Sequence, residues 1–160
     1  MPISQTLTTF LDRERVHYDV LPHAEAYRAR ATAQALPASD HMAAKVVIVK
    51  VDERFVMAVL PAGWNVDLHR LRDIFLTSHV RLATEGEIQR LFPDCELGAM
   101  PPFGNLYGLP VYVDQSLAED GEIVFPAGSH SEAIRMRYWD FATLVWPVVK
   151  EFHRSPLEIW

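Results

Sequence analysis

Apolar residues near the start of the chain recur at helical spacing. Leu7, Phe10 and Leu11 fall on one face of residues 4–15, and polar residues occupy the other faces. Ser4 is of a residue type that commonly caps helix N-termini. The pattern predicts an amphipathic helix here, followed by a half-buried strand over 16–21, where apolar and polar residues alternate until Pro22.

Two consecutive apolar runs predict a β-hairpin. Residues 44–51 are almost all β-branched and apolar, which is typical of a strand buried on both faces. A turn at 52–54 separates this run from a second one at 55–60, which Pro61 ends. We expect this hairpin to form the centre of a sheet.

Short helices and strands are predicted through the rest of the chain. Asp67 and Thr84 each begin a predicted helix, and Glu87, three residues after Thr84, completes a capping-box pattern. Further predicted helices span 24–35, with Thr32 as a candidate cap, and a segment that begins near Trp139. Strands are predicted at 80–82, 109–114, 123–125 and 133–137.

This mixture of elements lacks regular βαβ alternation, repeats and linkers. It predicts an α+β fold, in which one domain spanning residues 1–160 is built on a mixed, mostly antiparallel sheet or partial barrel flanked by short helices. The chain is long enough for one hydrophobic core, since 49% of its 160 residues are hydrophobic.

The charge and the apolar runs limit the classes of function. The net charge of −6 disfavours wrapping a long nucleic acid, because such binding depends on neutralising many phosphates. No apolar run approaches the roughly 20 residues that span a bilayer, and the first residues do not resemble a signal peptide. The single cysteine, Cys95, excludes an internal disulfide. We therefore expect a cytoplasmic protein with no membrane partner.

The stretch around two adjacent prolines is the first candidate for chemistry. Pro101 and Pro102 stiffen the backbone and lack N–H groups, while Gly98 can adopt angles closed to other residues. The N–H groups of Gly98, Ala99 and Met100 could converge on one oxygen as an oxyanion hole. A plain surface turn is the alternative.

Three further positions carry candidate side chains. Lys45 opens a strand otherwise too apolar for a charge, so its amine either reaches solvent or meets an anion. Gly128, Ser129 and His130 follow a strand and combine a permissive backbone with hydrogen-bonding side chains, although a surface turn is again an alternative. Asp114 stands at a strand end, where a capping role competes with a role in binding.

Other catalytic classes find little support. Cys95 lies between Asp94 and Glu96, whose charges raise a thiol pKa and disfavour a nucleophile. The seven histidines lack zinc-type spacing, and no Walker A loop, dinucleotide fingerprint or nucleophile elbow occurs. We therefore expect no metal and no cofactor.

Taken in order, Lys45 before its apolar strand, Gly98 to Pro102, and Gly128 to His130 resemble the YbaK-like family. These are free-standing relatives of the editing domain of bacterial prolyl-tRNA synthetase, and the resemblance covers about residues 15–144. It implies that Lys45, the loop from Gly98 to Pro102, and Gly128 with His130 line a pocket that hydrolyses mischarged tRNA. Ser129 and Asp114 are carried over with them as substrate-binding residues.

The resemblance further implies a reaction and a partner. The reaction is hydrolysis, without metal or protein nucleophile, of the ester that joins a small amino acid such as Ala, Ser, Thr or Cys to the terminal ribose. The backbone of Gly98, Ala99 and Met100 would stabilise the oxyanion, Lys45 would hold the tRNA end, and His130 would position water or substrate. The partner is the acceptor end of an aminoacyl-tRNA, with a synthetase or elongation factor as a further candidate. A binding module that has lost hydrolysis, and a thiol- or metal-dependent hydrolase, are the competing hypotheses.

Overall fold

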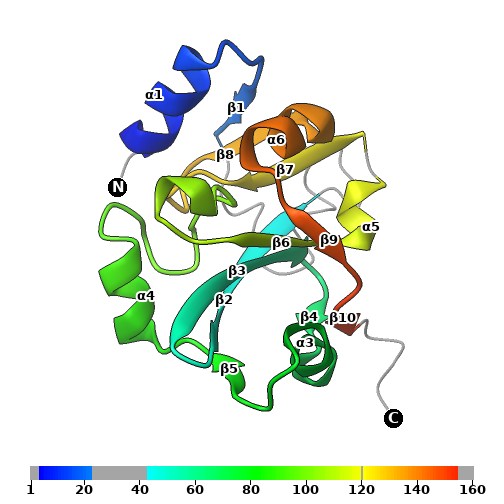
Figure 1. Cartoon of the computed structure of the whole chain (residues 1–160). Helices are drawn as coiled ribbons and strands as arrows, with labels where there is room; N and C mark the ends of the chain where they lie inside the picture. Colours follow the sequence, from blue (N-terminus) through cyan, green and yellow to red (C-terminus); the bar gives the residue numbers. More distant parts are fainter. Residues whose placement is uncertain (1–3, 23–42, 120, 155–160) are drawn as a thin grey trace.

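The predicted hairpin forms the centre of a five-stranded sheet. In the computed structural model, which describes residues 4–22, 43–119 and 121–154, β2 (Ala44–Val51) pairs antiparallel with β3 (Arg54–Pro61). The strand order is β5-β2-β3-β6-β9, with β5 at Val80–Leu82, β6 at Val111–Asp114 and β9 at Val148–Lys150. β6 runs parallel to both β3 and β9 (Figure 1).

Two smaller sheets complete the described strands. β1 (Asp19–Leu21), β8 (Ala133–Arg137) and β7 (Glu122–Pro126) form an antiparallel sheet in the order β1-β8-β7. β4 (Asn65–Val66) pairs with β10 (His153–Arg154). A parallel bridge between Ala43 and Val124 joins the start of β2 to β7. The sheet of β7 and β8 therefore lies across one face of the larger sheet (Figure 1).

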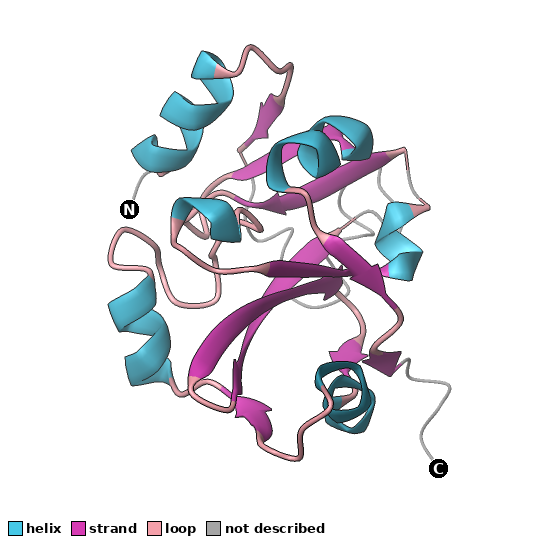
Figure 2. Cartoon of the chain, viewed as in Figure 1, coloured by secondary structure: helices cyan, strands magenta, loops and turns pink. Residues whose placement is uncertain are grey.

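The helices are short and lie around the sheets (Figure 2). Three of them have the N-caps that the sequence predicts: Ser4 caps α1 (Gln5–Arg13), Asp67 caps α3 (Leu68–Phe75), and a complete capping box with Thr84 begins α4 (Glu85–Leu91). The others are the 3-10 turn η2 (Gly104–Leu106), α5 (Gln115–Ala118) and α6 (Tyr138–Val145).

The central sheet has a hydrophobic cluster on each face. Alternation along β2 places Ile48 in a cluster with Met57 and Phe103, under the β7 and β8 sheet. It places Val49 and Val51 in a second cluster, which α3 covers. The prediction that this strand is buried on both faces is therefore confirmed.

The α+β prediction is confirmed, and five of the seven strand pairs among the described residues are antiparallel. Two predicted strands are shorter than expected, since β1 begins at Asp19 and β6 at Val111. α5 and the small strands β4, β9 and β10 were not predicted, because elements this short show no clear periodicity. The predicted helix at 24–35 lies outside the described residues. None of the described helices is long and apolar enough to cross a bilayer.

Candidate functional site

Two loops far apart in the sequence are held together by a set of hydrogen bonds. The Glu96 N–H donates to the Gly128 carbonyl at 2.8 Å, and the Gly128 N–H donates to the Ala99 carbonyl at 2.8 Å. The His130 N–H donates to Glu96 Oε1 at 2.9 Å. The loop that contains Gly98 and the turn that contains His130 therefore form one unit, as the resemblance to the YbaK-like family implies.

His130 lies over Gly98. A Cβ atom added to Gly98 would lie 3.6 Å from His130 Cε1, so the ring is in van der Waals reach of the glycine backbone. Gly98 has a φ of 85°, a conformation that L residues with side chains rarely adopt. The imidazole therefore lies against the backbone of the proline-stiffened loop.

Two hydrogen bonds fix the orientation of His130. Its Nε2 lies 2.8 Å from the Leu97 carbonyl oxygen, in addition to the main-chain bond with Glu96. The hydrogen bond from the His130 N–H is the largest cause that lowers the pKa of Glu96 below its ordinary value. A hydrogen bond with the Ser129 hydroxyl lowers this pKa further. Glu96 is therefore a carboxylate at neutral pH.

The loop does not present all of its predicted backbone donors. The Ala99 N–H donates to the Glu96 carbonyl at 3.0 Å within the turn itself. This corrects the expectation of three converging donors and leaves Gly98 and Met100, whose N–H groups have no hydrogen bond to the described residues. The Ala99 and Met100 side chains are buried.

Pro101 and Pro102 are also buried. They lead directly into Phe103, which packs in the first hydrophobic cluster beside Met100. We expected the prolines to contact substrate, but their burial gives them a different role. They anchor the loop to the core, so that its exposed part is the segment around Gly98.

No hydrogen bond or ion pair among the described residues joins Lys45 to this unit. It is the second residue of β2, opposite Leu60, and its Nζ lies 3.4 Å from Asn65 Oδ1 of β4. Leu60 belongs to the cluster under α3, whereas Met100 and Ala127 belong to the cluster on the other face. Partial burial lowers the pKa of Lys45. Of the three segments expected to converge, the structure brings two together.

Asp114 has a structural role in place of the expected contact with substrate. Its side chain is fully buried and caps α5 through the Ser116 N–H. Oδ1 also accepts from the N–H groups of Phe152 and His153, at 2.8 and 3.0 Å, and Oδ2 lies 3.0 Å from His153 Nδ1. Asp114 therefore ties the C-terminal segment to β6.

Ser129 is also buried, and its Oγ accepts from the Ser131 N–H at 3.0 Å. This bond shapes the turn that carries His130. The expected substrate contact of Ser129 is thus replaced by a supporting role.

Comparison with known proteins decides the family. The sequence profile described as the aminoacyl-tRNA editing domain matches residues 23–144, about three quarters of the chain. The chain belongs to this family.

The similarity extends to individual relatives. The editing domain is 30% identical over 74 residues to a proline--tRNA ligase of Bacillus cytotoxicus and 31% identical over 75 residues to that of Macrococcus caseolyticus. These matches cover 46% and 47% of the chain but only 13% of each ligase. A solved structure described as a candidate trans-editing enzyme for prolyl tRNA synthetase superposes with a TM-score of 0.82 at 20% identity. It covers 96% of this chain and 100% of its own. The fold is that of the YbaK-like editing domains.

Cys95 of the editing domain is part of a structural network. Burial is the largest cause that raises the pKa of its thiol to about 12, and the Asp94 carboxylate also raises it. Asp94 accepts hydrogen bonds from the hydroxyls of Tyr107, at 3.0 Å, and Ser4, at 3.1 Å. The thiol is therefore protonated at neutral pH and unsuited to nucleophilic attack, as the acidic neighbours predict.

Sequence reasoning missed two residues that shape the site. Glu96 was considered only as an acidic neighbour of Cys95, and Ser4 only as a helix cap. The Ser4 N–H donates to the Ala127 carbonyl at 2.8 Å, which docks α1 against the His130 turn. The Glu96–His130 bond and the Ser4–Ala127 bond each join segments that are distant in the chain, so no local pattern could indicate them.

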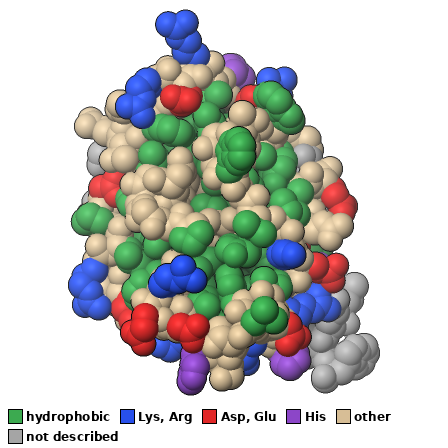
Figure 3. Space-filling view, viewed as in Figure 1, with side chains coloured by type: hydrophobic (Ala, Val, Ile, Leu, Met, Phe, Trp, Pro, Cys, Tyr) green, Lys and Arg blue, Asp and Glu red, His purple; other side chains and the backbone are tan. Residues whose placement is uncertain are grey.

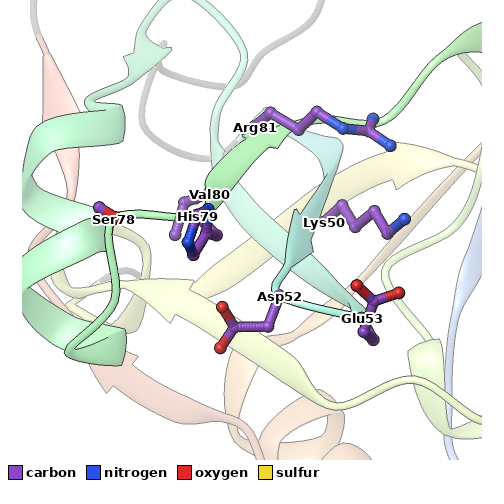
Figure 4. A pocket seen from close by; sticks show the side chains of 7 residues that line it. All are labelled: Lys50, Asp52, Glu53, Ser78, His79, Val80 and Arg81. Carbon is purple, nitrogen blue, oxygen red and sulfur yellow. The ribbon is translucent and has the colours of Figure 1, made fainter.

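Five surface pockets formed by the described residues are lined by neither Gly98 nor His130. One pocket, of about 460 Å³, lies at the β2–β3 turn and is lined by Lys50, Asp52, Glu53 and residues 78–81 (Figure 4). Its charges are of both signs, and Arg81 is already paired with Glu87 at 2.9 Å. Within the described ranges, no group of three or more His, Cys, Asp or Glu residues could hold a metal ion.

Apolar side chains gather over the middle of the face seen in Figure 3. Large exposed apolar residues of the chain include Trp139, Trp146 and two valines of β9. They flank a shallow pocket of about 430 Å³ beside α6. Neither Gly98 nor His130 lines this pocket.

Proposed function

We propose that this chain is a trans-editing aminoacyl-tRNA deacylase, which hydrolyses the ester of a mischarged tRNA bearing a small amino acid such as Ala, Ser, Thr or Cys. The observation that carries the proposal is the contact of His130 with the loop at Gly98, inside the segment that matches the editing-domain family. A synthetase pocket rejects a smaller amino acid by only ~1–3 kcal/mol per missing methylene, so a second hydrolytic site improves fidelity.

The proposed reaction needs few groups. Water adds to the ester carbonyl carbon, the bond from that carbon to the ribose oxygen breaks, and the ribose oxygen takes a proton. The N–H groups of Gly98 and Met100 stabilise the negative charge on the carbonyl oxygen, and each good donor contributes about 3 kcal/mol. His130 positions the water or the substrate, and the neighbouring ribose hydroxyl is a second candidate for the base.

Binding of the tRNA acceptor end involves Lys45 and further partners in this proposal. Lys45 holds the terminal phosphate or ribose, since it is an amine on a flexible stem at the start of β2. The net charge of −6 favours contact with the acceptor end alone, so a synthetase or elongation factor would assist encounter. Residues 1–160 act together as one editing domain.

The test is a deacylation assay with purified protein and alanyl-, seryl-, threonyl- and cysteinyl-tRNA. We expect at least one ester to be lost faster than without protein, and His130→Ala and Lys45→Ala to slow this loss by 10-fold or more. His79→Ala and Lys50→Ala are matched controls, because these residues line the distant pocket in Figure 4. Variants of His130 and Lys45 as fast as the parent would refute the site assignment.

A binding module of the same fold is the second candidate. The position of Lys45 opposite Leu60, on the face of the central sheet that α3 covers, favours it, because no hydrogen bond or ion pair of the described residues joins Lys45 to the unit of Gly98 and His130. Ester half-lives unchanged across the panel, together with saturable binding of uncharged tRNA, would support this function over hydrolysis.

A further inference from the structure

Glu96 holds His130 at its main chain, and Leu97 holds it at its ring. The Glu96 carboxylate accepts the His130 N–H at 2.9 Å, and the next residue along the loop accepts from the imidazole at 2.8 Å. The main chain of Glu96 is itself fixed by its bond to the Gly128 carbonyl. Both attachments of His130 thus come from two adjacent residues of one loop.

The ring contact determines where the imidazole proton lies. A carbonyl oxygen only accepts hydrogen bonds, so at 2.8 Å from the Leu97 carbonyl His130 Nε2 must carry the hydrogen. In the neutral ring the other nitrogen, Nδ1, then has a free lone pair. His130 is exposed, and none of the described residues is hydrogen-bonded to its Nδ1.

We propose that Glu96 is a positioning residue of the editing site, which keeps His130 in the tautomer with Nε2 protonated so that Nδ1 accepts a hydrogen bond from the attacking water or the ribose hydroxyl. This inference rests on the proposed function. Glu96 itself does not touch substrate. It acts by fixing the His130 backbone, which sets the distance from the ring to the Leu97 carbonyl.

The chemistry of the side chain explains why a carboxylate suits this position. A charged acceptor forms a stronger bond with a backbone N–H than a neutral one does. Glu96 also binds the Ser129 hydroxyl, so one side chain organises two consecutive residues of the turn. Glutamine retains an acceptor oxygen at the same place, whereas alanine removes it.

The first measurement is the pair of imidazole ¹⁵N chemical shifts of His130, at a pH where the ring is neutral. In the parent protein we expect the shifts of a ring protonated on Nε2 and bare on Nδ1. In Glu96→Ala we expect both signals to move toward a mixture of the two tautomers. Parent shifts that are already a mixture, or that show the hydrogen on Nδ1, would overturn the proposal whether or not the protein is a deacylase.

The second measurement is deacylation kinetics with the ester that the parent hydrolyses fastest. Glu96→Ala should lower kcat about 10-fold and change KM less than 2-fold, while Glu96→Gln should stay within about 3-fold of the parent. Glu132→Ala is the matched control, because it also removes a carboxylate from the His130 turn. The Glu132 side chain has no hydrogen bond to the described residues. Circular dichroism checks that each variant is folded.

The outcomes separate the two proposals. A parent with no activity on any ester contradicts the proposed function, while the nitrogen shifts still decide the role of Glu96. An active parent with unchanged kcat in Glu96→Ala leaves the deacylase in place and refutes the positioning role. Equal losses in Glu96→Ala and Glu96→Gln would also refute it, because the acceptor atom would then not be what matters.

Discussion

Gly128 combines two independent reasons to lack a side chain. Its φ of 91° lies in the region that L residues rarely adopt. A Cβ added there would also lie 2.8 Å from the Cβ of Ser4, closer than packed atoms approach. Since Gly128 precedes Ser129 and His130, its conformation sets both the docking of α1 and the direction of the turn that carries His130.

We predict that Gly128→Ala lowers the free energy of unfolding by about 2–4 kcal/mol. The alanine would have to adopt a left-handed backbone conformation, and its Cβ would be too close to Ser4. Urea denaturation measures the change. Gly63→Ala is the matched control, because a Cβ at Gly63 meets nothing within 4 Å and its φ is not positive. A loss of equal size in both variants would contradict the argument.

At the scale of elements, α4 shows how a local pattern fixes a helix start. The Thr84 hydroxyl accepts the Glu87 N–H at 3.2 Å, and Glu87 Oε1 accepts the Thr84 N–H at 2.8 Å. Arg81 of β5 also forms a bidentate ion pair with the Glu87 carboxylate, and each of its two hydrogen bonds is 2.9 Å long. Glu87 therefore links the end of a strand to the beginning of the helix that follows.

This linkage predicts a pH dependence of stability. The Arg81 bond is the largest cause that lowers the pKa of Glu87 to about 2. A lowered pKa in the folded state means that the charge stabilises the fold above the ordinary glutamate pKa, and that the benefit disappears as the pH falls through about 2. Glu87→Gln keeps the cap but removes the charge, so the parent should be the more stable protein at pH 7.

The stability difference between the parent and Glu87→Gln should shrink as the pH falls from about 4.5 to 2. Urea midpoints recorded across this range measure it. A difference that stays constant with pH would show that the carboxylate charge does not stabilise the folded state.

At the scale of the whole molecule, Phe103 joins the loop of the site to three distant elements. Its ring lies 6.1 Å from Phe10 of α1, 5.6 Å from Phe125 of β7 and 5.4 Å from Phe141 of α6, measured between ring centroids. Its side chain is fully buried. The loop that carries Gly98 is thus attached to the larger core, which fixes its position relative to β7 and the His130 turn.

We predict that Phe103→Ala lowers the free energy of unfolding by about 3–5 kcal/mol, because it removes a large buried ring and leaves a cavity. Thermal and urea unfolding measure the loss. Trp139→Ala is the matched control, since 70% of that side chain is exposed and its removal should cost far less. Comparable losses in the two variants would contradict a central role for Phe103.

The sequence by itself determined the elements whose signals are local. The hairpin of β2 and β3 follows from two apolar runs around a polar turn, and Ser4, Asp67 and Thr84 cap helices because a side-chain oxygen needs only an N–H two or three residues away. The motifs at Gly98 and His130 indicated that their two loops meet only through the resemblance to the YbaK-like family. Short pieces such as β9 escaped prediction because they are defined by pairing with β6.

Only the tertiary structure decided what each polar side chain faces. Asp114 became a buried anchor for Phe152 and His153, and Glu96 became the acceptor for His130, because their partners lie 34 to 39 residues away. Strand alternation likewise assigned Lys45 to the face of Leu60, away from Met100. Local spacing determines hydrogen bonds within a turn or helix, whereas contacts between distant segments depend on how the whole chain packs.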